Sequence, residues 1–179
     1  MAIIAKDGGG NSFELVEAGV HLALCYGVID LGTQKEVFQG AEKLLRKVRL
    51  IFEIPNLRKE FKAGEGEKPF SISKEYTLSL SEKSNLFKDL VSWRGKQFTQ
   101  EELEGFDLSK LLGKPCQVQI IHKQGKNGEY AFLQGITAIM KGTNYPKLTI
   151  NPICEFSVDD FSKSKFDSLP EYLRKKIEE

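Results

Sequence analysis

Basic and aromatic side chains gather in two stretches of this 179-residue chain. Residues 41–63 contain seven Lys or Arg against three acids, and residues 113–147 contain five against one, so each stretch has a net charge of +4 while the whole chain has +1. Clustered cations neutralise phosphates, and aromatic rings provide faces on which bases stack, each stack being worth about 1–3 kcal/mol. The two stretches therefore indicate binding to a single-stranded nucleic acid.

The candidate contacts combine these two residue types. Phe61 has the clearest setting, because it follows Arg58 and Lys59 in a polar segment and has little core to enter. Rings on strand-like segments are more often part of a core, and a single lysine on a strand is more often solvated. The predicted DNA-binding residues are Lys47, Arg49, Arg58, Lys59, Phe61, Lys62, Lys123, Lys126, Tyr130, Tyr26 and Tyr145.

Motifs for catalysis are missing from the sequence. His21 and His122 lie in strand-like patterns and neither is next to a nucleophile motif such as GxSxG. The glycines at 8–10 lack the following Lys-Ser/Thr of a phosphate-binding loop. The adjacent acids at 101–102 suit the first turn of a helix, and adjacent side chains such as those at 159–160 diverge on a strand. We therefore expect a protein that is not an enzyme and has no catalytic residues and no cofactor.

The composition is that of a soluble globular protein, with 28% charged and 40% hydrophobic residues. No window approaches the roughly 18 apolar residues of a membrane helix, and the first residues lack the order of a signal peptide. Cys25, Cys116 and Cys154 are widely spaced, which argues against a disulfide framework or a structural zinc. We expect a cytoplasmic location, no membrane partner, and cysteines that are small buried apolar residues.

Strand patterns dominate the first 80 residues. Residues 19–31 form one strand, with a bulge at Gly27 and a turn region over 32–40. Residues 47–54 show the clearest alternation, and Pro55 ends it. A mobile connection over 56–69 leads to a strand over 72–80. The apolar face of the second strand contains Val48, Leu50, Phe52 and Ile54, opposite Lys47, Arg49 and Glu53.

Helical spacing appears after residue 80. Ser81 is the predicted N-cap of a helix that ends at Gly95, and Thr99 and Asp107 begin two shorter helices, the last ending at Gly113. Strands over 116–122 and 129–139 follow, joined by a hairpin turn over 125–128. A further short helix is expected over 169–177.

Three strands, a helical connection and two strands are the order of an OB-fold. We therefore predict a mainly β protein: a five-stranded OB-fold Greek-key barrel, with a helical insertion between strands 3 and 4 and a C-terminal extension. The expected boundaries are a flexible N-terminal segment over 1–12, the OB-fold domain over 13–154, and the extension over 155–179. An immunoglobulin-like sandwich would need about seven strands.

Several short segments resemble the single-stranded DNA-binding proteins of tailed bacteriophages, which are OB-fold proteins of this size. They are Val28-Ile-Asp-Leu-Gly32, Tyr76-Thr-Leu-Ser-Leu-Ser81, Trp93-Arg-Gly-Lys-Gln-Phe98, Gly105-Phe-Asp-Leu108, Leu112-Gly-Lys-Pro-Cys116 and Gly128-Glu-Tyr-Ala131. The resemblance implies sequence-independent binding of single-stranded DNA in phage replication or recombination, in the host bacterial cytoplasm, with replication or recombination proteins as partners. The ending Arg174-Lys-Lys-Ile-Glu-Glu179 departs from the strongly acidic tail of many such proteins.

Two alternatives stay open. An OB-like adaptor or structural protein would bind another protein through the helical insertion or the C-terminal extension, because fold does not imply function. A nuclease would need acids that converge within metal-binding distance. DNA binding is favoured if the bases at 47, 49, 58, 59, 123 and 126 share one concave face, and self-association into a homo-oligomer is left open.

Overall fold

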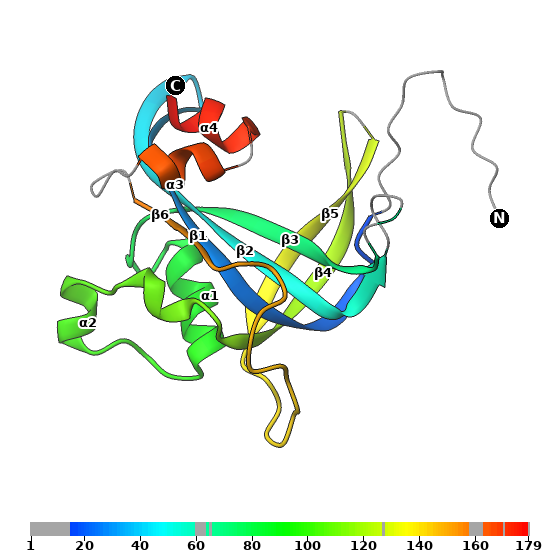
Figure 1. Cartoon of the computed structure of the whole chain (residues 1–179). Helices are drawn as coiled ribbons and strands as arrows, with labels where there is room; N and C mark the ends of the chain where they lie inside the picture. Colours follow the sequence, from blue (N-terminus) through cyan, green and yellow to red (C-terminus); the bar gives the residue numbers. More distant parts are fainter. Residues whose placement is uncertain are drawn as a thin grey trace.

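The computed structural model describes residues 15–59, 64, 66–126, 128–157, 163–169 and 171–178. Long antiparallel strands come first, followed by helices, a hairpin and a C-terminal helical segment (Figure 1). None of the helices in these ranges is long and apolar enough to cross a membrane. The elements are β1 (Gly19–Phe38), β2 (Ala41–Lys59), β3 (Lys68–Thr77), α1 (Asn85–Arg94), α2 (Gln100–Glu104), the 3-10 helix η1 (Leu108–Leu111), β4 (Pro115–Gly125), β5 (Gly128–Thr137), β6 (Cys154–Phe156), α3 (Lys163–Ser168) and α4 (Glu171–Glu178).

One sheet organises the molecule, and the mainly β prediction is confirmed. Its strand order is β3-β2-β1-β4-β5 with antiparallel neighbours, and the short β6 pairs in parallel with β1. The sheet is strongly curved (Figure 1), and it ends at β3 and β5 without closing. The two edges nevertheless approach, because Lys74 Nζ of β3 lies 5.3 Å from the ring of Phe132 in β5.

The first hairpin is longer than predicted. Residues 32–38, expected to be a turn region, continue β1 and pair with the start of β2, and the turn itself is Gln39-Gly40. Polar residues on both faces leave no alternation there, so pairing with β2 makes this part a strand. The bulge at Gly27 is confirmed by a register shift, and a Cβ at this position would lie only 2.9 Å from Cβ of Ile51.

The second strand does not stop at Pro55. It continues to Lys59, and β3 begins at Lys68 and ends at Thr77, so part of the predicted 56–69 connection is strand. The pairing of β2 with β3 is irregular between Ile54 and Arg58, which accommodates a proline without an N–H to donate. Residues 60–63 and 65 lie outside the described residues.

Local capping explains the helical segment between β3 and β4. The N-cap of α1 is Ser84 rather than the predicted Ser81, and its Oγ accepts a hydrogen bond from Phe87 N. Gly95 ends the helix in the left-handed conformation, with a φ of 71°. Thr99 begins α2 with a capping box to Glu102, as its sequence suggests.

Two hydrophobic cores lie on opposite faces of β1. The main core is enclosed by the curved sheet and α1, and it contains Val28 and Phe52. The second core lies on the outer face and joins β1 to β6, α3 and α4. Because adjacent strand residues point to opposite faces, β1 contributes to both cores. The buried members of the second core are Ile29, Leu31, Phe156, Leu169 and Leu173.

The three cysteines should differ in reactivity. Cys25 and Cys116 are buried, as predicted, whereas Cys154 is only partly buried. Burial raises the pKa of the Cys25 thiol to about 12 and also raises the pKa of Cys116 well above its ordinary value. Since the thiolate is the reactive form, iodoacetamide at mildly alkaline pH should alkylate Cys154 first, and the other two only after denaturation. Mass spectrometry of a time course measures this order, and equal rates for all three thiols would contradict it.

Candidate nucleic-acid interface

Cations and rings meet on the β4–β5 hairpin. The register places Lys123 opposite Tyr130 and Ile121 opposite Phe132 on one face of the pair. Lys123 Nζ lies 3.7 Å from the centroid of the Phe132 ring, which is a close cation–π contact. Tyr130 is 43% exposed and packs along Gly125, where a Cβ would lie 3.1 Å from its ring. The hairpin thus presents an exposed ring next to a cation.

The edge strand β3 adds a second cation, Lys74. Lys74 Nζ lies 5.3 Å from the Phe132 ring and forms a 3.2 Å ion pair with Asp89 of α1. Tyr76 donates a 2.6 Å hydrogen bond to the same carboxylate. Burial, together with the charge of Asp89, raises the pKa of Tyr76 above its ordinary value, so the hydroxyl stays a donor. This network holds Lys74 at the gap between the two sheet edges.

We call this group the hairpin cluster: Lys74, Lys123, Lys126, Tyr130 and Phe132. Lys126 is exposed near the hairpin tip. Three of the five members are predicted site residues, and Lys74 and Phe132 were missed. The signal that could have identified Lys74 is a lysine two residues away from both Ile72 and Tyr76, the buried residues of the same strand face.

Arg58 and Lys59 lie at the end of β2. Arg58 is exposed, and its Nε donates a 2.9 Å hydrogen bond to the Pro55 carbonyl oxygen. The end of β2 and the tip of the β4–β5 hairpin are both on the right side of the molecule in Figure 1. The predicted contacts Phe61 and Lys62 follow Lys59 and lie outside the described residues.

Lys47 and Arg49 are engaged within the fold. Lys47 is 9% exposed and its Nζ donates a 3.1 Å hydrogen bond to Thr77. Arg49 forms a 2.9 Å ion pair with Glu75, and Lys176 of α4 binds the same carboxylate at 2.8 Å. The C-terminal helix therefore lies next to the part of β2 on which these two predicted contacts stand.

The remaining predicted tyrosines occupy other places. The hydroxyl of Tyr26 is hydrogen bonded to Ser71 of β3 at 3.0 Å, and its ring lines a cavity of about 480 Å³ beside β6. Tyr145 is 38% exposed on the connection between β5 and β6. The structure thus brings together only part of the predicted set.

Glu53 is a buried charge that the sequence pattern placed on the polar face of β2. It is fully buried, and its carboxylate accepts hydrogen bonds from the backbone N–H groups of Ile150, at 2.8 Å, and Asn151, at 2.9 Å. The Asn151 side chain donates a third bond at 3.2 Å. Glu53 thereby ties the β5–β6 connection to β2.

Replacing Glu53 by alanine should lower the free energy of unfolding by about 2–3 kcal/mol, because two backbone donors lose a charged acceptor. Guanidinium denaturation followed by circular dichroism measures the effect. Glu42→Ala, at an exposed position of the same strand, is the matched control and should change the stability by less than about 0.5 kcal/mol. Equal midpoints for the two variants would contradict the anchoring role.

Several of the acidic and histidine side chains that the structure describes serve contacts within the fold. Within the described ranges, no three His, Cys, Asp or Glu side chains are grouped so that they could hold a metal ion. His21 Nε2 is hydrogen bonded to the Glu17 carbonyl oxygen at 2.8 Å, and His122 Nε2 is hydrogen bonded to the Val16 carbonyl oxygen at 2.7 Å. Glu102 serves the α2 cap, and residues 159–160 lie outside the described part of the chain.

Comparison of the chain with protein-family models, curated proteins and solved structures found no match.

Proposed function

We propose that this protein is a non-catalytic OB-fold protein that binds single-stranded DNA without sequence preference. The sheet order and the helices between β3 and β4 are those expected of an OB-fold, whose sheet face and β4–β5 loop bind oligonucleotides. The observation that carries the proposal is the hairpin cluster, in which Lys74 and Lys123 both approach Phe132 beside the exposed ring of Tyr130. Cations pair with the phosphates of a single strand and aromatic rings stack with its bases, so a surface that combines the two suits this ligand.

The proposed mechanism divides the work between charge and stacking. Lys123, Lys126 and Arg58 attract the phosphates, while Tyr130 and the open part of Phe132 receive bases. Every base has a face that stacks, so binding is tolerant of sequence. A duplex hides these faces inside its own stack, and the protein therefore favours single strands. Such a protein coats DNA exposed during phage replication or recombination, the role suggested by the resemblance of its sequence segments.

The proposed DNA-binding surface is the hairpin cluster, and the middle of β2, where Lys47 and Arg49 lie, is not part of it. Arg49 pairs with Glu75, a carboxylate that it shares with Lys176 of α4, and Lys47 is buried against Thr77. These two residues therefore support the sheet between β2 and β3. Lys74, which is paired with Asp89, supports Phe132, and the other members of the hairpin cluster make the contacts to DNA.

Fluorescence anisotropy of labelled oligo-dT tests the proposal. The protein should bind the single strand at least tenfold more tightly than the matching duplex. With about three phosphates neutralised, the logarithm of the affinity should fall with the logarithm of the salt concentration with a slope of about −2. Absence of binding at low salt, or equal binding to duplex, would rule out this function.

A further inference from the structure

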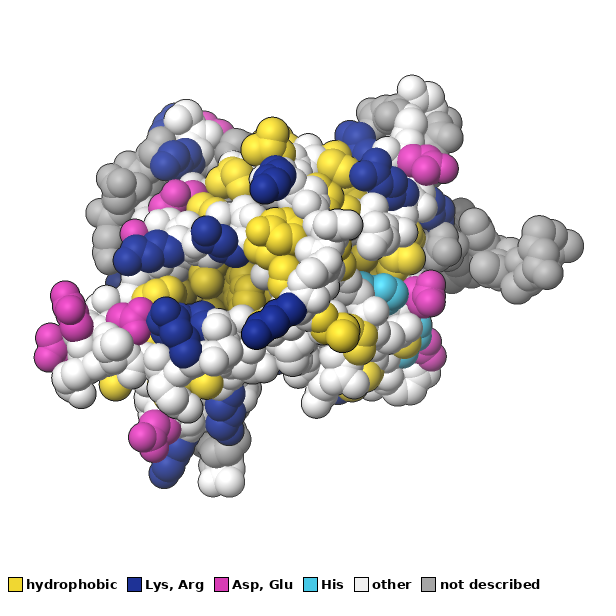
Figure 2. Space-filling view, turned by 90° about the horizontal axis from the view of Figure 1, so that it is seen from below, with side chains coloured by type: hydrophobic (Ala, Val, Ile, Leu, Met, Phe, Trp, Pro, Cys, Tyr) yellow, Lys and Arg dark blue, Asp and Glu magenta, His cyan; other side chains and the backbone are white. Residues whose placement is uncertain are grey.

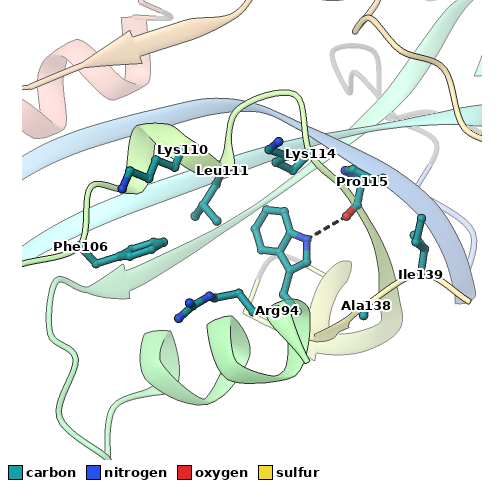
Figure 3. A pocket seen from close by; sticks show the side chains of 9 residues that line it. Arg94, Phe106, Lys110, Leu111, Lys114, Pro115, Ala138 and Ile139 are labelled. Carbon is teal, nitrogen blue, oxygen red and sulfur yellow. Dashed lines mark hydrogen bonds between the residues drawn. The ribbon is translucent and has the colours of Figure 1, made fainter. Parts of the chain in front are cut away.

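A preformed apolar cavity lies at the junction of α1, η1, β4 and the end of β5. Its volume is about 380 Å³, within the range of ligand pockets. Figure 3 shows the side chains around it, and Figure 2 shows a hollow of apolar side chains bordered by Lys and Arg on this side of the molecule. The apolar lining residues are Trp93, Phe106, Leu111, Pro115, Ala138 and Ile139.

Hydrogen bonds hold the cavity walls in place. Trp93 Nε1 donates a 2.8 Å hydrogen bond to the carbonyl oxygen of Pro115, which joins α1 to β4. The backbone N–H of Ala138 donates to the Ser92 carbonyl at 3.2 Å, which joins the end of β5 to α1. The indole also packs 5.6 Å from Phe52 in the main core. A ligand would therefore meet a formed cavity and would not have to order its walls.

Three cations surround this apolar floor. Arg94 stacks 4.3 Å from the Phe98 ring, pairs through Nη2 with Glu102 at 2.6 Å, and has a buried Nη1 without a hydrogen-bond partner in the described part of the chain. Lys110 lies 5.9 Å from the Phe106 ring, and Lys114 is exposed. Among the described residues that line the cavity there is no acid. The border is thus positive. Glu102 already pairs with Nη2 of Arg94, so a ligand would meet Nη1 of Arg94 together with Lys110 and Lys114.

We propose that this cavity binds a short acidic peptide of a partner protein. A large apolar side chain of the peptide fills the cavity, and flanking carboxylates pair with Lys110, Lys114 and Arg94. A nucleobase fits less well, because its polar edge would find apolar walls and an indole N–H that Pro115 already uses. The proposal assigns a protein-binding site that is separate from the hairpin cluster and independent of DNA binding.

Anisotropy of a fluorescein-labelled peptide tests the site. The probe is acetyl-Glu-Asp-Phe-Asp-Glu-Leu-amide, with one companion peptide in which Phe and Leu become Ser and another in which the acids become amides. The probe should bind, and both companions should bind at least tenfold more weakly. Trp93, the only tryptophan of the chain, provides a second signal, because its emission should change when the cavity is filled.

Variants of the protein locate the binding. The double variant Lys110→Glu/Lys114→Glu should weaken binding of the probe at least tenfold. The control Lys88→Glu/Lys147→Glu makes the same charge change at exposed positions outside the cavity, and it should change the affinity for the probe by less than threefold. Ala138→Trp fills the cavity without changing its charge and should also abolish binding. Circular dichroism confirms that each variant is folded.

Three outcomes would overturn the proposal: no binding of the probe to the wild-type protein, equal loss in the two charge variants, or displacement of the probe by oligo-dT. The last outcome would assign the cavity to nucleic acid. A failure of oligo-dT to bind at all would overturn the proposed function and leave this site untouched.

Discussion

Replacing Phe132 by alanine is expected to weaken binding of oligo-dT by about five- to 150-fold, because a base–ring stack contributes about 1–3 kcal/mol. The ring has a further role, since Lys123 at 3.7 Å and Lys74 at 5.3 Å both approach it. Its removal therefore loosens two cations as well as one stacking face. Anisotropy titrations at a single low salt concentration measure the change.

The charge contribution is separated by a second variant. Lys123→Gln removes one phosphate contact and should make the salt slope shallower by about 0.7. Phe106→Ala is the matched control, because it deletes a partly buried ring next to Arg94 and Lys110, at the cavity beside α1. Phe106→Ala should leave the affinity for oligo-dT unchanged and should weaken binding of the acidic peptide. Equal losses of DNA affinity in Phe132→Ala and Phe106→Ala would contradict the hairpin cluster as the interface.

Replacing Leu173 by alanine should lower the free energy of unfolding by about 2–5 kcal/mol, the usual range for a buried leucine. Leu173 is fully buried in the second core, on the opposite side of β1 from Phe52. Since β1 contributes Val28 to the main core and Ile29 to the second, damage to one core should destabilise both. Leu44→Ala, at a position 67% exposed, should change the stability by less than about 0.5 kcal/mol.

Two spectroscopic signals show whether the C-terminal segment unfolds with the sheet. Trp93 lies in the main core and reports on it by fluorescence, while far-ultraviolet circular dichroism includes α3 and α4. In Leu173→Ala, both midpoints of denaturation should move together to lower guanidinium concentration. A loss of helical signal at an unchanged Trp93 midpoint would show instead that the segment folds separately from the sheet.

Local patterns were enough to predict several elements. The alternation around Leu50 and Phe52 identified a buried strand face, because a half-exposed strand repeats every two residues. Thr99 with Glu102 identified a helix start, since this spacing satisfies two backbone donors at once. The Asn-Gly pair in the sequence of 125–128 identified the turn of the hairpin. Each signal involves residues close together in the chain, which is why sequence alone revealed it.

Other features depend on contacts between distant residues. Strand pairing, and not an apolar pattern, extends β1 through 32–38 and carries β2 beyond Pro55. Glu53 is buried because the β5–β6 connection covers it. The residues next to Glu53 in the sequence give no indication of this burial. The same holds for Arg49, whose partner Glu75 is shared with Lys176 of α4.

The candidate sites follow the same division. Sequence identified basic stretches and rings, and so the class of ligand that they would suit, because charge and residue type do not depend on the fold. The curvature of the sheet (Figure 1) decided which of them meet, because it brings Lys74 of β3 to Phe132 of β5. The packing of α1 against β4 places Trp93 at the cavity. Composition therefore pointed to the proposed chemistry, and tertiary packing decided which of the basic and aromatic side chains lie together, because contacts between distant strands are made only in the folded chain.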